Sequence, residues 1–391
     1  MCMKYIIRLL LLFVILPAFS LNCANNEPRR DDKQEVLRVV KSEEPMLHDT
    51  LFFKSAKLIP LETTTDCLIR KIDKIFVVDD KMIIFDDRLD AVYIYDSTGK
   101  FITRIGTRGQ GPKEYIQITD IYVDVDKKEI LLLCDRPYKI MFFNLDGKFI
   151  REFNTKKYYE GFSQIGDTIL CVPSEYEEKR NIDIYTVSGE FQETMWVDSD
   201  VQTYRMDNQS TTYSFSSGST MSGFRDEVLF TYSYVPYIYA YRNGNITIKY
   251  QLDFGDLWIP SNLLNKRTPA NELQQICMKE GYKIVLENMM ETSDFLLLNT
   301  NNSFIVYDKT TNRCTEYFSI IHSETGIGMP RFIPIPNSNH IAQAIEANRF
   351  LRMLEDRKKI NVQYGIANSI DIEKYGIKID DNPLVILYEL P

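Results

Sequence analysis

The chain has 391 residues, with 46 basic and 55 acidic side chains, which gives a formal charge of −9. It has no long basic run that could neutralise a phosphate backbone, so nucleic acid is excluded as a partner. Aromatic residues make up 12% of the sequence, and 24 Tyr and 22 Phe stand against 2 Trp. Because Tyr and Phe favour half-buried pleated surfaces, this composition favours β-structure. The length fits one large β domain or two ordinary domains.

The first 22 residues have the layout of a secretory signal. A short basic start precedes an apolar run from Leu9 to Phe19, and a polar stretch follows Cys23 directly. The apolar run is too short for a comfortable membrane span. We therefore expect residues 1–22 to be a signal peptide that takes no part in the fold.

The letters "FSLN" before Cys23 resemble the lipobox of bacterial lipoproteins, in which this cysteine becomes the lipidated N-terminus. Ser20 departs from the motif, which usually has Leu there, and ordinary cleavage with release is the alternative. Acyl chains would hold a domain on a membrane through a flexible linker. The sequence thus predicts a lipidated N-terminus and flexible tether at 23–49, and a single folded domain at 50–391.

A hairpin recurs along that domain. The stretch "VYIYDSTGKFITRIG" (92–106) is echoed by "IMFFNLDGKFIREFN" (140–154), and weaker copies follow at 182–196, 237–251 and 304–318. Each copy is preceded by one or two further apolar runs, which completes a unit of four strands. Four antiparallel strands repeated every 40–55 residues or so are typical of a β-propeller.

The units predict an all-β fold, a six-bladed β-propeller of four-stranded antiparallel blades. Five or seven blades and a β-sandwich are the alternatives. We expect the strand "LFFKSAKLIPLE" (51–62) to join "PLVILYELP" (383–391) in one sheet, because an open ring would expose unpaired backbone groups. Two stretches, 261–282 and 337–359, have apolar residues at helical spacing and predict decorating helices.

The stretches "LIPLETTTDCLIRKIDKI" (58–75), "YDSTGKFITRIGTRGQGPKEY" (95–115) and "DDNPLVILYELP" (380–391) together resemble the six-bladed β-propeller lipoproteins of Bacteroides and its relatives. The resemblance covers the chain from about Leu51 to Pro391. It implies the fold and a cell-envelope location, with a lipoprotein anchored at the outer membrane on its periplasmic or outer side, and it implies no activity. Lys113 departs from the pattern, which commonly has glycine there, and this argues against a strictly glycine-dependent backbone.

The glycine-rich stretch "IGTRGQGPKEY" (105–115) does not fit a phosphate-binding loop. Gly106 and Gly111 have the right spacing, but Pro112 stands where the lysine is required, and a strand follows instead of a helix. The stretch lies between the last strand of one unit and the first strand of the next, so it is a connector. Five of its side chains are the candidate ligand-binding residues: Arg108, Gln110, Lys113, Glu114 and Tyr115.

No catalytic set is evident from the sequence. The histidines His48, His322 and His340 are far apart, and five internal cysteines have no metal-ligand spacing and are expected as buried thiols, with a disulfide as the alternative. We therefore expect no catalytic residues, no cofactor and no metal site, and a module that binds a carbohydrate, a peptide or an envelope protein. The alternative is a carboxylate- or calcium-dependent hydrolase or lyase with its site in the central channel. The acidic stretches 77–90 and 124–129 would supply its ligands.

Overall fold

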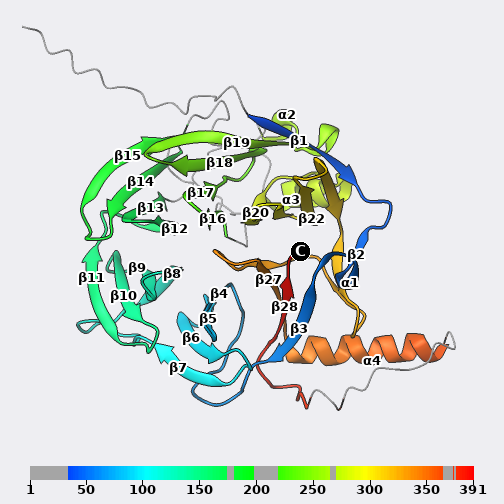
Figure 1. Cartoon of the computed structure of the whole chain (residues 1–391), viewed down its shortest axis with the longest axis horizontal. Helices are drawn as coiled ribbons and strands as arrows, with labels where there is room; N and C mark the ends of the chain where they lie inside the picture. The colour runs from blue at the N-terminus through cyan, green and yellow to red at the C-terminus, as the bar shows by residue number, and fades with distance from the viewer. Residues whose placement is uncertain (1–33, 174–179, 198–218, 265–269, 364–372, 374–375) are drawn as a thin grey trace, which may run out of the picture.

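The computed structural model describes residues 34–173, 180–197, 219–264, 270–363, 373 and 376–391. Antiparallel sheets stand around a common centre like the sectors of a ring (Figure 1). The first sheet contains β4 (Lys74–Val78), β5 (Lys81–Asp86), β6 (Ala91–Asp96) and β7 (Phe101–Ile105). The second contains β8 (Gln117–Asp124), β9 (Glu129–Asp135), β10 (Lys139–Asn144) and β11 (Phe149–Asn154). The third contains β12 (Tyr159–Ile165), β13 (Thr168–Pro173), β14 (Asn181–Thr186) and β15 (Phe191–Trp196).

Two further groups of four antiparallel strands are joined into one nine-stranded sheet. One group is β16 (Met221–Phe224), β17 (Glu227–Phe230), β18 (Tyr237–Arg242) and β19 (Asn245–Asp253). The other is β20 (Leu286–Glu291), β21 (Phe295–Thr300), β22 (Phe304–Asp308) and β23 (Arg313–Tyr317). Strand β1 (Glu35–Lys41) runs parallel to β19 and to β23 and links the outer strands of the two groups.

The last sheet joins a strand near the start of the described chain to the strand at its end, as the sequence predicts. It contains β26 (Ile333–Pro334), β27 (His340–Ile345), β28 (Leu384–Glu389) and β3 (Ser55–Pro60). Leu384 pairs with Pro60 and Glu389 with Ser55, so all six residues of β28 have partners on β3. This pairing removes the edge that an open ring would have.

The inner wall of the ring is formed by the first strand of each group. Side chains of β4, β8, β12, β16, β20 and β26 line one narrow cavity. Lys74 Nζ on β4 lies 2.6 Å from Asp120 Oδ1 on β8, and the other oxygen of Asp120 accepts a 3.1 Å hydrogen bond from Phe162 N on β12. Four-stranded antiparallel sheets placed radially about an axis form a β-propeller. The predicted all-β class is confirmed.

The two faces of the ring differ because the strands alternate in direction. One face carries the tight turns, where Gly99, Gly147, Gly189 and Gly244 have φ between 77° and 94°. The opposite face, here named the connector face, carries the segments that link one sheet to the next. Helices α2 (Ser261–Leu264), α3 (Ala270–Glu280) and α4 (Ala347–Gln363) all belong to connections on this face.

One sequence expectation is corrected by the strands of the last sheet. Residues 340–345, expected as part of a helix, form β27, because the segment pairs with β26 and with β28 and buries Ile341, Ala342 and Ile345. The helix begins only at Ala347.

The segment 35–49, expected as part of a flexible tether, lies within the fold. It contains β1 and β2 (Met46–His48) and leads into α1 (Asp49–Phe52). Strand β2 pairs with β24 (Ser319–His322), which in turn pairs with β25 (Ile327–Met329). Leu37 and Leu47 are buried, so this segment contributes to the core.

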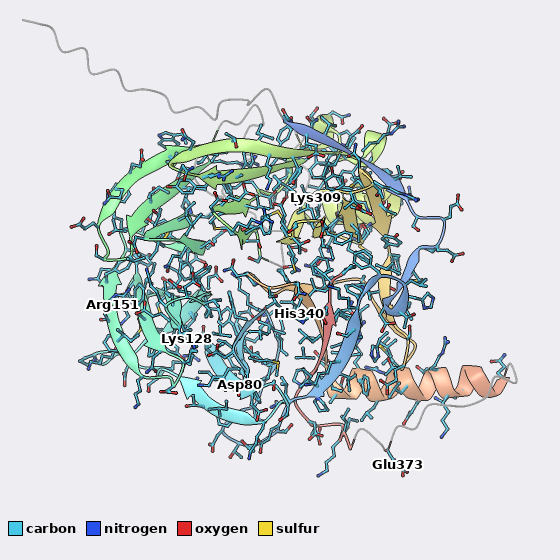
Figure 2. All side chains as sticks on the ribbon, in the orientation of Figure 1. Asp80, Lys128, Arg151, Lys309, His340 and Glu373 are labelled. Atoms are coloured by element: carbon cyan, nitrogen blue, oxygen red, sulfur yellow. The ribbon has the colours of Figure 1, made fainter. Side chains whose placement is uncertain are left out.

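Side chains fill the space between the sheets throughout the ring (Figure 2). Arg151, labelled at the outer side of the second sheet, bonds Glu129 at 3.1 Å and covers the ring of Phe142. The five internal cysteines are buried free thiols, as expected: Cys67, Cys134, Cys171, Cys277 and Cys314. Within the described ranges we find no helix with the length and apolar character that a membrane crossing requires.

Candidate functional site

A cavity of about 390 Å³ opens beside the inner strands at the connector face. Three segments form most of its wall: residues 70–73 before β4, residues 329–333 around the start of β26, and residues 344–349 where β27 leads into α4. Asn288 on β20 and Pro383 before β28 complete it. The size lies in the usual range of small-molecule sites, which is roughly 300–1,000 Å³. We name this cavity the axial pocket.

The channel beneath the axial pocket is nearly filled. Phe76, Tyr122 and Phe162 point into it, and about 20 Å³ remains free, which is room for about one water molecule. Asp73, Asn288 and Ile333 line both cavities and mark the floor of the axial pocket. A ligand can therefore occupy the mouth of the channel but cannot enter its interior.

Four cationic side chains line the axial pocket, and two of them are neutralised by neighbouring carboxylates. Lys71 bonds Asp73, and Arg331 bonds Glu287, a residue with 0% exposed surface. A buried carboxylate needs such a partner, because an uncompensated buried charge is strongly destabilising. These two cations therefore have a structural role.

The other two cations are Arg70 and Arg349, and both are exposed. Within the described part of the chain, neither guanidinium has a carboxylate at ion-pair distance. Their backbones are fixed: Arg70 N donates a 2.6 Å hydrogen bond to Asp86 Oδ2, and Arg349 belongs to the first turn of α4. The pocket thus presents two unneutralised positive groups on firmly held backbone.

Three carboxylates gather next to this wall, and their oxygens lie within 4.8 Å of one another: Asp73, Asp86 and Asp87. Burial, followed by hydrogen bonding to Asp73, raises the pKa of Asp87 from 3.8 to about 6. Asp86 already accepts hydrogen bonds from four backbone N–H groups, those of residues 70, 71, 88 and 89. Asp86 therefore stabilises its turn, and Asp87 does not line the axial pocket.

The connector 105–115 runs from the outer strand β7 to the inner strand β8, as the sequence predicts. Tyr115 is fully buried, and its hydroxyl donates a 3.0 Å hydrogen bond to the carbonyl oxygen of Asp90. Gly106 has φ +67°, and a Cβ there would lie 2.9 Å from Cε1 of Tyr115. Tyr115 thus fastens the connector to the first sheet and offers no surface to a ligand.

The other candidate residues of the connector are engaged to different degrees. Glu114 Oε2 accepts a 2.7 Å hydrogen bond from Gly111 N, and Arg108 lies 3.3 Å from Asp90 Oδ2. Lys113 lies over the ring of Phe149, and Gln110 is exposed. Lys113 has φ +64°, so a left-handed backbone is present here although the glycine is not. None of these side chains lines the axial pocket.

Sequence reasoning missed the axial pocket because its wall comes from segments far apart in the chain. The available signal was indirect: the basic letters of "IRKIDK" (69–74) directly precede the first strand of the first unit. Their partners on 329–333 and 344–349 become neighbours only when the ring closes. Cys23, the predicted lipidation site, lies outside the described residues.

Comparison with solved structures supports the fold. A "putative exported protein" from Bacteroides fragilis matches with a TM-score of 0.70 at 17% identity, over 91% of this chain and 99% of that one. The WD40 domain of Neurospora crassa Pan2 matches with a TM-score of 0.40 at 8% identity, over 81% and 75% of the two chains. The β-propeller domain of Myceliophthora thermophila Cps50 matches with a TM-score of 0.37 at 10% identity, over 71% and 95%. The last two are too distant to carry an argument.

No curated protein matches the sequence. A family described as "Domain of unknown function (DUF4934)" matches residues 35–389, which begins at the first residue of β1 and ends at the last residue of β28. The match spans the sheets, the axial pocket and the connector. The chain therefore belongs to the DUF4934 family.

Proposed function

We propose that this protein is a six-bladed β-propeller of the cell envelope, anchored as a lipoprotein through Cys23, which binds a carbohydrate in the axial pocket. The observation that carries the proposal is the pocket itself. It is a cavity of about 390 Å³ at the mouth of a filled channel, walled by apolar and charged side chains from three segments. A mixture of apolar surface and a few fixed polar groups is typical of small-molecule sites.

A sugar suits this wall better than an apolar ligand does. Ile333 and Ala344 are half-buried and offer apolar surface to the C–H face of a ring. Glu346 is exposed on the rim, where its carboxylate can accept hydrogen bonds from hydroxyl groups. The connector residues 108–114 lie on the same face, outside the pocket, where they can contact further units of a longer ligand.

The alternative of a carboxylate-dependent hydrolase rests on the closeness of Asp73 and Asp87. Two features speak for binding instead. Asp73 is bonded to Lys71, and Asp87 does not line the pocket, so this pair cannot flank a bond of a ligand held there. Enzymes that cleave glycosides need two carboxyl groups on either side of the scissile bond.

A pocket-filling variant tests the binding site. Glu346→Trp places a large ring on the exposed rim. The backbone is unaffected, because Phe350 N still donates its 2.8 Å hydrogen bond to the carbonyl oxygen of residue 346. We expect Glu346→Trp to abolish binding in a glycan panel read by calorimetry, and Glu346→Gln to retain most of it. Equal binding by the wild type and Glu346→Trp would place the ligand elsewhere on the molecule.

A separate experiment tests the anchor. Metabolic labelling with a palmitate analogue, followed by membrane fractionation, should show label and membrane association in the wild type. Cys23→Ser should lose both, because no acyl chain can be attached to serine in this pathway. A labelled Cys23→Ser protein, or an unlabelled wild type in the soluble fraction, would contradict the lipoprotein assignment.

A further inference from the structure

Resting on the proposed function, we infer that the ligand of the axial pocket is an acidic sugar whose carboxylate is held by Arg70 and Arg349. The two guanidinium groups approach the cavity from different elements, the segment before β4 and the first turn of α4. A guanidinium binds a carboxylate through two parallel hydrogen bonds, which fixes orientation as well as charge.

The charges around the pocket support this assignment. Most cations near the inner strands are paired: Lys71 with Asp73, Arg331 with Glu287, and Lys74 with Asp120. Arg70 and Arg349 differ, since no described carboxylate lies at ion-pair distance from either of them. At the pocket, Arg70 and Arg349 are two cations without a described carboxylate partner, and such groups attract an anion.

The backbone of both arginines is held by the fold, so no loop has to become ordered when a ligand binds. Asp86 is fully buried and accepts the backbone N–H groups of residues 70 and 71, which fixes the start of the Arg70 side chain. Arg349 lies beside Phe350, which has 0% exposed surface and fastens the first turn of α4 to the core. A backbone that is already ordered lowers the entropy cost of binding, although the two exposed side chains still lose rotamer freedom.

The remaining lining of the pocket favours a sugar carboxylate over phosphate. Glu346 carries a negative charge on the same wall, and it would repel a doubly charged phosphate more strongly than a singly charged carboxylate. Glu346 can instead accept hydrogen bonds from the hydroxyl groups of a sugar acid. The pocket therefore combines an anion clamp, a hydroxyl acceptor and an apolar wall.

Titration calorimetry with galacturonate and glucuronate oligosaccharides tests the inference, with the neutral galactose and glucose oligosaccharides and inorganic phosphate as comparison probes. We expect the wild type to bind an acidic oligosaccharide at least tenfold more tightly than its neutral counterpart. Arg70→Gln and Arg349→Gln should each weaken acidic binding by about tenfold, as expected for one charge-assisted hydrogen bond. Binding of the neutral oligosaccharide should change less than twofold.

Arg352→Gln is the matched control, because Arg352 is an exposed residue on the same helix that does not line the pocket. It should bind like the wild type. The inference is overturned if neither arginine variant changes acidic binding, if phosphate binds more tightly than the sugar acids, or if no acidic probe binds. Loss of neutral-sugar binding in Glu346→Trp alone, with both arginine variants unaffected, would uphold the carbohydrate site and reject the clamp.

Discussion

The connector 105–115 and the axial pocket lie on the same face of the ring, and both contain arginine, lysine and glutamate. They differ in how many of these charged groups have partners within the protein. In the connector, the Glu114 carboxylate, the Tyr115 hydroxyl and the Arg108 guanidinium all bond to nearby parts of the protein. In the pocket, two of four cations have no carboxylate partner within the described residues. Most polar groups of the connector therefore already have partners within the protein, whereas the pocket has two cations without a carboxylate partner among the described residues.

The greatest loss of stability is expected for a substitution in the connector, at Tyr115. Tyr115→Ala removes a fully buried ring and should lower the free energy of unfolding by about 3–5 kcal/mol, as large-to-small core substitutions do. Tyr115→Phe should cost about 1 kcal/mol, because only the hydrogen bond to Asp90 is lost. Urea denaturation measures both. If Tyr115→Ala had the same free energy of unfolding as the wild type, Tyr115 would not be what holds the connector in place.

A second pair of substitutions compares the stability contribution of Arg331, which is paired with a carboxylate, with that of Arg349, which is not. Arg331→Gln should lower the free energy of unfolding by about 2 kcal/mol, because it removes the guanidinium that is bonded to the buried Glu287 carboxylate. Arg349→Gln should change it by less than about 0.5 kcal/mol, as is usual at exposed positions. If chemical denaturation gave equal losses for the two variants, the distinction between paired and unused cations would fail.

The third effect tests the fit between Gly106 and Tyr115. Gly106→Ala should cost about 1–2 kcal/mol, because alanine is strained at φ +67° and its Cβ would lie 2.9 Å from the Tyr115 ring. Gly166→Ala is the matched control, since φ there is +55° and nothing lies within 4 Å of the added Cβ. The two thermal midpoints should differ. Equal midpoints would assign the whole effect to backbone strain and none to Tyr115.

The smallest effect is a pH dependence at the edge of the pocket. The pKa of Asp87 is raised from 3.8 to about 6, so the folded protein keeps a proton that the unfolded chain releases between these values. Stability should therefore fall as the pH rises from 4 to 6, and this contribution should be absent in Asp87→Asn. Thermal unfolding from pH 4 to pH 7 checks the difference. Parallel curves for the two proteins would show that Asp87 does not titrate in this range.

The sheets were predictable because the same hairpin recurs from residue 92 to residue 318. In each copy the third and fourth strands of the unit pair antiparallel. Strand β27 was harder. Its Ile341, Ala344 and Ile345 have a spacing that fits a helix, and a segment of six residues is too short for periodicity to decide. Strand β1 was missed because only tertiary pairing with β19 and β23 makes it a strand.

The axial pocket could not be predicted for a different reason. Arg70 and Arg349 line one cavity only through the arrangement of the ring, and no local pattern links them. The position of the connector between two units could be predicted from the sequence. Its hydrogen bonds could not be predicted. Tyr115 is buried because it packs against Gly106 and because its hydroxyl donates a hydrogen bond to the carbonyl oxygen of Asp90. Asp90 belongs to the turn before β6.

The pairing of β3 with β28 also sets an order on biosynthesis. Residues 55–60 are made early, yet their only partners in the last sheet are residues 384–389. The ring therefore cannot be completed until nearly all of the described chain has been synthesised, and long-range pairing of this kind is slow to form. Because β28 is the last strand of the described chain, its pairing with β3 can form only after all the other described strands have been made.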